Sequence, residues 1–389
     1  YLKSIWEYGY KTADNAARVI QASQALYNNA SDDEKTELNM YMAEAYALRG
    51  YAQLLLTNIY GHQIKVNGQD FSSELGIVII DQPKEALTKI SRSTVGESYE
   101  AIINDLKNAL SHFEAAGKDR GELQYLGKAA TNGLLARTYL YLENWDEARN
   151  YAEQALKTAG ITTLTNDANA YKALYNSEIS NSESMFALAI TNTTNWSANS
   201  YGTLWSTYNF SPSPKLISMY ATNDCRKILI DGRDKTSTES EPVYTGGKIA
   251  HFSSGNPARG TNYIVNAPEM YLIKAEANVQ LNKLNEAKEA LLVVAKRNLE
   301  STNDLPSEKE NLMSFIKDER ARELFQEGMR LYDLRRWNER VSVYANSAPA
   351  IKFTYTNYEI SNLVFPIPSA EINAGFGVTQ NNWTNTLPK

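Results

Sequence analysis

Hydrophobic residues recur at helical spacing through much of the chain. Between residues 270 and 281, Leu272, Ala275 and Val279 fall at i, i+3 and i+7, so one side of the predicted helix is apolar and built largely from small side chains. Small side chains allow a second helix to approach closely. After a polar break the same spacing returns over residues 287–294. This pattern is typical of a tetratricopeptide-like helix hairpin.

The same pattern occurs earlier in the chain. Residues 136–149 match residues 275–288 at a fixed offset of 139 positions, in their alanines, in a Glu-Ala pair and in the hydrophobic turn residue, which is Trp145 or Leu284. An offset of 139 is not a whole number of the ~34-residue periods of tetratricopeptide repeats. We therefore expect a block of other structure between the two hairpins.

The pattern of hydrophobic and polar residues also predicts the other helices and loops. Residues 61–92 predict a long loop with one short strand at 77–80. The chain after Trp337 is irregular, contains Pro349, Pro366 and Pro368 among its four prolines, and is expected to lie over the helices. Ser93 or Thr94 is expected to cap the helix that follows the long loop. The predicted helices before residue 160 cover residues 1–28, 35–60, 93–112, 128–142 and 146–158.

Residues 161–265 differ from the rest of the chain. Asn, Ser, Thr, Gly and Tyr dominate them, helical periodicity is weak, and residues 185–190 read as a strand. We predict a mainly α fold, a tetratricopeptide-like helical repeat superhelix with a loop-rich mixed insertion. The predicted domains are helical repeats at 1–160, the insertion at 161–265, and a C-terminal helical region with its tail at 266–389.

Charge and hydropathy exclude several classes of protein. The net charge is −6 with a pI near 5.4, and no basic cluster is longer than Arg335-Arg336. Nucleic acid and anionic membrane are therefore poor candidates for the main partner. No run approaches the ~20 apolar residues of a membrane span. The first residues lack the layout of a signal peptide, so we expect the chain to begin inside a longer protein.

Metal and cofactor chemistry has little support in the sequence. The single cysteine, Cys225, excludes an intramolecular disulfide and a multi-thiolate metal site. The histidines His62, His112 and His251 are far apart and lack the spacing of metal ligands. Motifs for phosphate binding, dinucleotide binding or a serine nucleophile are missing. We expect no metal and no cofactor.

Three glutamates in the charged segment offer two interpretations. Glu319, Glu323 and Glu327 lie at i, i+4 and i+8 in what we expect to be a charged helix ending at Trp337. Two carboxylates are the machinery of glycoside hydrolysis, so a hydrolase using Glu319 and Glu323 is one interpretation. Arginines alternate with these glutamates at i, i+3, which is typical of a salt-bridged helix. A carboxylate beside arginines stays ionised and is a poor general acid, so we expect no catalysis.

Aromatic side chains remain as the candidates for ligand binding. The chain has 25 Tyr and 6 Trp against 10 Phe, a bias toward rings that carry a polar group. One group lies within residues 191–208 among Asn, Ser, Thr and Gly, and another lies near the start. Such rings suit stacking on sugars, although they could equally form a local core. The predicted carbohydrate-binding residues are Trp6, Tyr10, Trp196, Tyr201, Trp205 and Tyr208.

Three motifs, in this order, resemble the C-terminal half of the SusD/RagB family. They are Tyr-Leu-Ile-Lys-Ala-Glu-Ala at 271–277, the segment Glu-Arg-Ala-Arg-Glu-Leu-Phe-Gln-Glu-Gly at 319–328 with its continuation to Trp337, and Phe-Pro-Ile-Pro-Ser-Ala-Glu-Ile-Asn at 365–373. The start, from Trp6 to Tyr10 and on to Asn15, resembles the family's first conserved helix.

This resemblance implies a surface-exposed outer-membrane lipoprotein of Gram-negative bacteria. It implies four tetratricopeptide-like units, a loop-rich face that holds the ligand on an arc of aromatics, and a lipidated cysteine upstream of this chain. Such proteins capture oligosaccharides, less often peptides, and cap a TonB-dependent, SusC-like transporter. The leading hypothesis is a non-catalytic glycan-binding protein. The alternatives are a peptide- or protein-binding repeat scaffold and the glycoside hydrolase.

Overall fold

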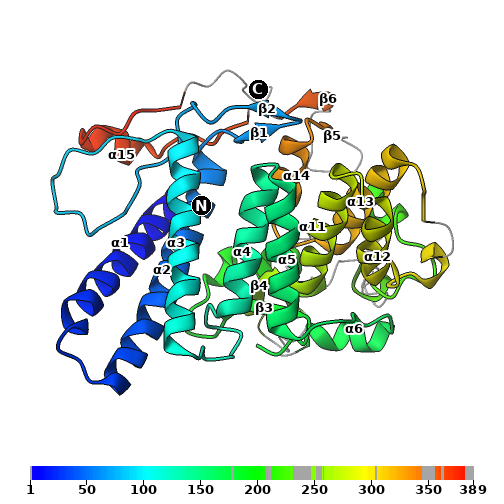
Figure 1. Cartoon of the computed structure of the whole chain (residues 1–389). Helices are drawn as coiled ribbons and strands as arrows, with labels where there is room; N and C mark the ends of the chain where they lie inside the picture. Colours follow the sequence, from blue (N-terminus) through cyan, green and yellow to red (C-terminus); the bar gives the residue numbers. More distant parts are fainter. Residues whose placement is uncertain are drawn as a thin grey trace. The chain divides into compact units, whose positions relative to one another are not determined.

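The protein is mostly helical. The computed structural model describes residues 2–176, 179–206, 208, 212–230, 247–250, 256, 258–302, 305–343, 355–360 and 363–381. These residues form fifteen α-helices and six short strands (Figure 1), which confirms the predicted mainly α, tetratricopeptide-like class. Contacts divide the chain into two compact units. The first comprises Tyr1–Arg120, Leu126–Asn144 and Leu331–Lys389, and the second comprises Gly121–Tyr125 and Trp145–Arg330. The three predicted domains stay a prediction.

The first unit is built around three long helices that pack side by side, α1, α2 and α3 (Figure 1). Its short strands form the antiparallel pairs β1–β2 and β5–β6. Its elements are α1 (Leu2–Tyr27), α2 (Asp32–Tyr60), β1 (Lys65–Val66), β2 (Gln69–Asp70), α3 (Val95–Ala116), α4 (Lys128–Tyr141), nearly all of α14 (Arg330–Arg336), β5 (Arg340–Val343), β6 (Tyr355–Glu359) and α15 (Ser369–Ala374).

Capping boxes fix the starts of α2 and α3. The Ser31 hydroxyl accepts from the Glu34 N–H, and the Glu34 carboxylate accepts from the Ser31 N–H. Thr94 and Glu97 make the same reciprocal pair at the start of α3. Each box satisfies two N–H groups that the first helical turn leaves without a partner. The cap of α3 is thus Thr94 rather than Ser93.

The core of the first unit joins segments that are far apart in sequence. Trp6 and Ala13 of α1 pack with Leu56 of α2, and Ile77 from the long loop and Ile367 from the tail complete the cluster. The prediction that the chain after Trp337 lies over helices is confirmed for this part of the tail. Burying such apolar side chains is the main stabilising contribution to a domain of this size.

The predicted strand at residues 77–80 is wrong. The segment is extended, but it has no strand partner because its N–H groups donate to side chains instead. Val78 N donates to the Tyr10 hydroxyl at 3.0 Å, and Ile80 N donates to Gln53 Oε1 at 2.8 Å. Side chains of α1 and α2 thus bind residues 77–80 in place of the neighbouring strand that a sheet would require.

The second unit has α11 at its centre, in contact with α5, α12 and α13 (Figure 1). Strand β3 confirms the strand predicted at 185–190 and pairs antiparallel with β4, from Ser184 opposite Asn266 to Ile190 opposite Gly260. The elements are α5 (Trp145–Ala159), α6 (Ala168–Leu174), β3 (Ser184–Ile190), the 3-10 turn η1 (Ser197–Asn199), α7 (Tyr201–Ser206), α8 (Pro214–Ser218), α9 (Lys227–Ile230), α10 (Gly247–Ala250), β4 (Gly260–Asn266), α11 (Ala267–Gln280), α12 (Leu284–Ala295), η2 (Leu299–Thr302) and α13 (Lys309–Glu323).

The two copies of the internal repeat have the same turn geometry, after α4 and after α11. Glu143 after α4 has φ 54° and Asn282 after α11 has φ 59°, both in the left-handed region. In each turn the next residue donates its N–H to the carbonyl five positions back, at 3.0 Å from Asn144 and 2.8 Å from Lys283. The left-handed residue reverses the chain and satisfies the last helical carbonyls. The offset of 139 residues therefore relates two equivalent helix ends.

The charged segment is not one helix. Helix α13 ends at Glu323 and α14 begins at Arg330, and the turn between them contains Gln326 at φ 66° and Gly328 at φ 77°. Two left-handed residues cannot continue a right-handed helix. The prediction of a single helix through Trp337 is therefore wrong, and Glu327 lies in the turn.

Candidate functional site

Four of the six predicted sugar-binding aromatics lie in the second unit around η1 and α7. Trp196 is 48% exposed, Tyr201 37% and Tyr208 54%, whereas Trp205 is half-buried. Monomeric proteins rarely leave several large aromatic rings uncovered in one short segment. This segment is therefore the stronger candidate for a binding surface.

Hydroxyl and amide side chains fix the backbone that carries these rings. Trp196 N donates to Ser200 Oγ at 2.7 Å, Thr203 Oγ1 donates to Ser197 O at 2.9 Å, and Asn195 Nδ2 donates to Thr191 O at 2.8 Å. Short polar side chains commonly satisfy the backbone of turns in this way. The exposed rings thus stand on an ordered turn that also presents polar groups.

Trp205 connects the aromatic segment to the turn after α13. Its ring meets Tyr201 edge-on at 6.2 Å between centroids and Phe325 edge-on at 5.3 Å. Edge-to-face geometry is favoured between aromatic rings. Burial of the Tyr201 hydroxyl end raises the pKa of this phenol. A neutral phenol can donate or accept a hydrogen bond. Trp205 therefore packs between Tyr201 and the turn after α13.

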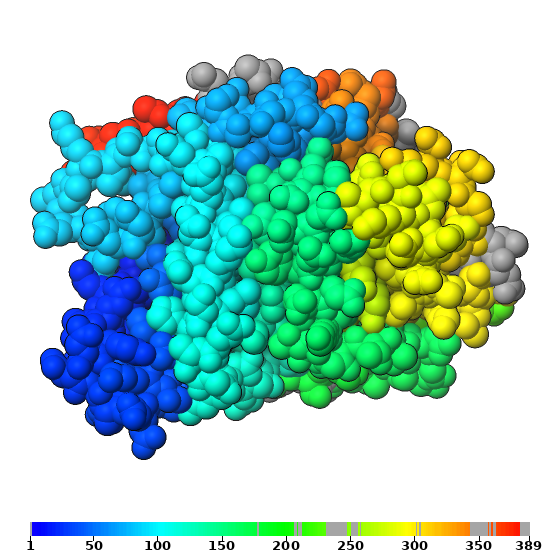
Figure 2. All heavy atoms as spheres, in the orientation of Figure 1, coloured from blue at the N-terminus to red at the C-terminus, as the bar shows by residue number. Residues whose placement is uncertain are grey.

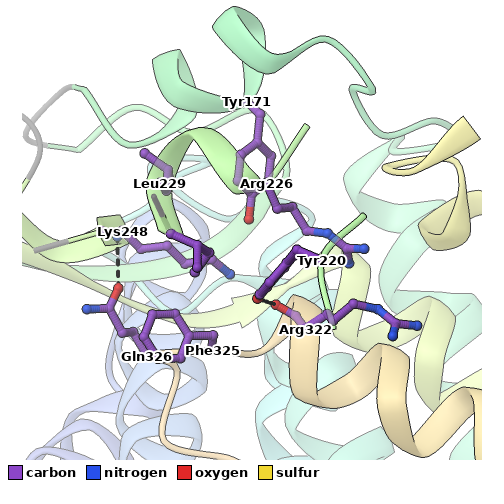
Figure 3. A pocket seen from close by; sticks show the side chains of 10 residues that line it. Tyr171, Tyr220, Arg226, Leu229, Lys248, Arg322, Phe325 and Gln326 are labelled. Atoms are coloured by element: carbon purple, nitrogen blue, oxygen red, sulfur yellow. Dashed lines mark hydrogen bonds between the residues drawn. The ribbon is translucent and has the colours of Figure 1, made fainter. Parts of the chain in front are cut away.

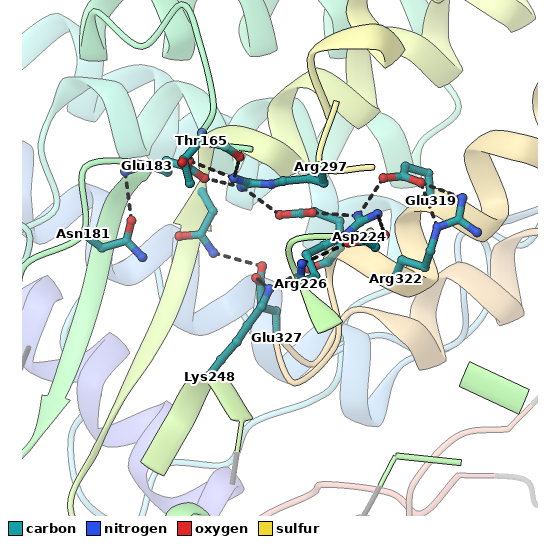
Figure 4. Close-up of polar contacts among 12 residues, drawn as sticks. Thr165, Asn181, Glu183, Asp224, Arg226, Lys248, Arg297, Glu319, Arg322 and Glu327 are labelled. Atoms are coloured by element: carbon teal, nitrogen blue, oxygen red, sulfur yellow. Dashed lines mark hydrogen bonds and ion pairs between the residues drawn. The ribbon is translucent and has the colours of Figure 1, made fainter. Parts of the chain in front are cut away.

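A buried ion network surrounds Arg226 in the second unit (Figure 4). Arg226, which is 2% exposed, contacts Asp224 at 2.7 Å, Glu319 at 2.7 Å and Glu323 at 2.9 Å. Arg322 donates to the second Glu319 oxygen at 2.6 Å. Buried charges are tolerated only when they are paired and hydrogen-bonded in this manner.

A second arginine extends the network toward β3. Arg297, with 0% of its side chain exposed, binds Glu323 at 3.1 Å, makes a two-pronged contact with Glu183, and donates to Thr165 O. The planar guanidinium suits such forked pairing with a carboxylate. Residues far apart in sequence are thereby locked into one cluster (Figure 4).

Lys248 of α10 completes the network. Its ammonium group donates to Glu327 Oε1 and to the Glu323 carbonyl, both at 2.6 Å, while Asn266 donates to the other Glu327 oxygen at 2.9 Å. The Lys248 N–H donates to Gln326 at 2.9 Å (Figure 3). The cavity beside these groups measures about 10 Å³. That volume holds about one water molecule, so it is no substrate pocket.

The electrostatics of Glu323 oppose acid catalysis. Burial raises the pKa of this carboxyl, but the attraction of Arg297 and Arg226 outweighs burial and lowers the pKa to about 2. A general acid must be protonated near its working pH and must reach the substrate. Glu323 is ionised and 0% exposed, and Glu319 is 1% exposed. Both serve as structural anions, as the salt-bridge interpretation predicted, although within a buried cluster.

Trp6 and Tyr10 belong to the first unit and are placed differently. Trp6 is only 6% exposed, packs against Tyr10 at 4.6 Å and Tyr60 at 4.9 Å between centroids, and donates its indole N–H to Glu371 at 3.2 Å. Burial raises the pKa of the half-buried Tyr10 phenol. The structure pairs these two rings with each other, and a sugar-binding role for them stays a prediction.

Other candidate groups have local structural partners. The His62 ring stacks on Phe71 at 4.2 Å, and His112 bonds Asn39 at 2.9 Å, while His251 lies outside the described residues. Cys225 is buried, which raises its pKa to about 12. Among the described residues, no group of His, Cys, Asp and Glu side chains could hold a metal ion. Within the same ranges, no helix is both long and apolar enough to cross a membrane.

Sequence reasoning missed the partners in the ion network. Asp224 and Arg226 come from the loop-rich segment, Glu183 precedes β3, Lys248 lies in α10 and Arg297 follows α12. Periodicity carries no signal for such contacts, because each partner stands alone in its own stretch of sequence. The unusual density of glutamate and arginine at 319–336 was the one available signal.

Comparison with known proteins finds two family models that match this chain. A family model described as "Starch-binding associating with outer membrane" matches residues 1–140, and the model of the SusD family matches residues 253–383. Together they match more than half of the chain. No protein of curated function matches it significantly.

Several solved structures share the fold. A SusD superfamily protein from Bacteroides thetaiotaomicron is similar with a TM-score of 0.82 at 24% identity, covering 97% of this chain and 85% of its own. A protein from Bacteroides vulgatus, provisionally called a sugar binding protein, is similar with a TM-score of 0.82 at 26% identity, covering 98% and 85%. Another SusD superfamily protein of that organism is similar with a TM-score of 0.79 at 24% identity, covering 98% and 86%. The two family models and the shared fold lead to one conclusion: this chain belongs to the SusD family.

Proposed function

We propose that this protein is a non-catalytic, surface-exposed glycan-binding protein that captures oligosaccharides and delivers them to a TonB-dependent outer-membrane transporter. The observation that carries the proposal is the set of exposed rings at Trp196, Tyr201 and Tyr208, set among hydroxyl and amide side chains. A flat apolar ring fits a pyranose face, and neighbouring polar groups bond the sugar hydroxyls. The SusD family assignment and a similar structure called sugar binding support the same ligand class.

Capture without cleavage agrees with the state of the two carboxylates that could suggest hydrolysis. Glu319 and Glu323 are buried and paired with arginines, so neither can protonate a glycosidic oxygen. Incubation of the protein with a panel of oligosaccharides tests both halves of this statement. We expect measurable binding and no increase in reducing ends. Release of reducing ends by the pure protein would contradict the proposal.

A peptide ligand is the competing outcome of the same panel. Helical repeat surfaces commonly hold peptides, so peptides of mixed composition should be screened beside the glycans. We expect the glycans to bind, because the exposed rings are surrounded by groups that match sugar hydroxyls. Binding of peptides with no glycan response would replace glycan capture by peptide capture.

Delivery to a transporter requires a second surface. The family description of association with the outer membrane supports this part of the proposal. We expect a transporter contact to bury an area much larger than one aromatic side chain, as stable protein interfaces do. Co-purification with a SusC-like transporter should therefore survive Trp196→Ala. Loss of both transporter and glycan by this single substitution would contradict separate surfaces.

A further inference from the structure

The first unit contains a cavity of about 380 Å³ that the glycan proposal does not use. Helix α1, the loop at residues 78–90 and the region of α15 form its walls. In Figure 2 the surface is hollowed between the blue α1 and the light-blue loop. The volume lies within the range of about 300 to 1,000 Å³ typical of ligand pockets. The apolar residues that line it are Trp6, Tyr10, Val78, Ile80, Leu87, Ile90 and Phe376.

Hydrogen bonds hold this cavity open. Lys84 N donates to Asp14 Oδ1 at 3.1 Å, which ties the loop to α1, and Ile90 N donates to Phe376 O at 2.8 Å, which ties it to the segment after α15. Gly377, at φ 105°, lies so close to the Ile90 carbonyl that no Cβ would fit there. The walls are therefore formed before any ligand arrives, which reduces the entropy lost on binding.

The polar part of the lining is acidic. It contains four carboxylates, Glu7, Asp14, Glu85 and Glu371, against the single ammonium group of Lys84. Asp14 is paired with a neighbouring arginine at 2.7 Å, and Glu371 accepts the indole N–H of Trp6.

Two of these carboxylates have no such partner. Within the part of the chain that the structure describes, the side-chain carboxylates of Glu7 and Glu85 make no hydrogen bond and no ion pair, and both residues are exposed. Lys84 is already paired with Asp81 at 2.7 Å. The rim of the cavity thus carries negative charge that the protein itself does not neutralise.

Leu87 adds an independent feature at the same rim. Its side chain is 80% exposed, and its backbone has φ 65°. A leucine in the left-handed region is strained, and its exposure to water gains nothing from the hydrophobic effect. Such unfavourable conformations persist mainly where function uses them. Leu87 therefore offers apolar surface beside the unpaired carboxylates.

We propose that this cavity binds an organic cation: a primary amine whose apolar part enters the chamber and whose ammonium group lies at the rim with Glu7 and Glu85. The aromatic and aliphatic lining removes the apolar part of the amine from water. The carboxylates add charge-assisted hydrogen bonds. This site lies in the first unit, whereas the aromatic segment lies in the second. Under this proposal Trp6 and Tyr10 line an amine site rather than a glycan site.

Titration calorimetry with 2-phenylethylamine as the probe and 2-phenylethanol as its neutral analogue tests the proposal. We expect the amine to bind at least about tenfold more tightly than the alcohol, and more weakly at high salt because exposed charges are screened. The double variant Glu7→Gln, Glu85→Gln should lose about tenfold in amine affinity. The control Glu100→Gln removes one exposed carboxylate of the same unit outside the cavity and should bind like the parent.

Thermal melting of each variant checks folding, and the exposed positions should leave Tm unchanged. Equal affinity for amine and alcohol, or an amine affinity unaffected by the double variant, would overturn the proposal. So would a neutral oligosaccharide whose binding disappears in the double variant, because that result would assign the cavity to sugar. Absence of amine binding at millimolar concentration would also overturn it, and would leave glycan binding by the second unit untouched.

Discussion

Trp196 and Trp205 belong to the same segment but have different surroundings. This difference indicates which ring packs inside the protein and which is available to a ligand. Trp205 packs edge-on against Phe325 at 5.3 Å and against Tyr201 at 6.2 Å. Trp196 leaves 48% of its surface in water. We therefore propose that Trp205 holds the aromatic surface in place and that Trp196 contacts the ligand.

Trp205→Ala should destabilise the protein more than Trp196→Ala. Removing the half-buried ring leaves space beside Phe325, and we expect a loss of about 2 to 3 kcal/mol in the free energy of unfolding, below the range for fully buried rings. Trp196→Ala should change it by less than about 0.5 kcal/mol, as surface substitutions do. Denaturant unfolding of both variants measures the difference. Equal losses would show that Trp196 is also a packing residue.

Glu323 predicts a fall in stability toward acid. Its pKa is lowered from 4.5 in the unfolded chain to about 2, so its contribution is complete above pH 4.5 and disappears as pH falls to about 2. The shift corresponds to a contribution on the order of 3 kcal/mol. Glu327 opposes this trend, because burial raises its pKa and its protonation favours the folded state as pH falls.

Denaturant unfolding at a series of pH values from 6 to 2.5 measures the contribution of Glu323 to the free energy of unfolding. We expect the free energy of unfolding to decline across the interval below pH 4.5, because the ion pairs of Glu323 with Arg226 and Arg297 are lost on protonation. A free energy that stays constant over that interval would contradict an ionised, arginine-bound Glu323.

At the scale of elements, local sequence signals identified the helices well. The repeat of alanines and the polar break placed the turns at Glu143 and Asn282, because a helix end needs only nearby residues. The strand expected at 77–80 failed for the opposite reason. The N–H groups of Val78 and Ile80 bond to Tyr10 and Gln53, which lie 68 and 27 residues away, so the local sequence carries no signal of these contacts.

The start of α3 offers a direct test of its capping box. Thr94→Ala removes the hydroxyl that accepts the Glu97 N–H, and we expect a loss of about 1 kcal/mol in the free energy of unfolding. Ser93→Ala, one residue earlier, should leave stability unchanged, because Ser93 contributes only backbone groups to hydrogen bonds. Thermal melting of the two variants decides the matter. A larger loss at Ser93 would move the cap to that residue.

At the scale of the whole molecule, the sequence predicted the helical class and the family better than the site. Motifs at 271–277, 319–337 and 365–373 carried the resemblance to the SusD/RagB family, and the family models match both ends of the chain. The candidate rings could be named from composition, but their exposure could not. Whether Trp6 is covered depends on Tyr60 and Glu371, which only the folded chain brings to it.

If the exposed rings of the second unit hold a glycan, removing one of them must weaken glycan binding. Isothermal titration of an oligosaccharide that binds the parent protein should show a loss of about 1 to 3 kcal/mol in binding free energy for Trp196→Ala, as for aromatic anchors at binding sites. Trp145→Ala, at a repeat turn, is the matched control and should bind with parental affinity in its folded fraction. Unchanged affinity in Trp196→Ala with an unchanged melting temperature would contradict the account.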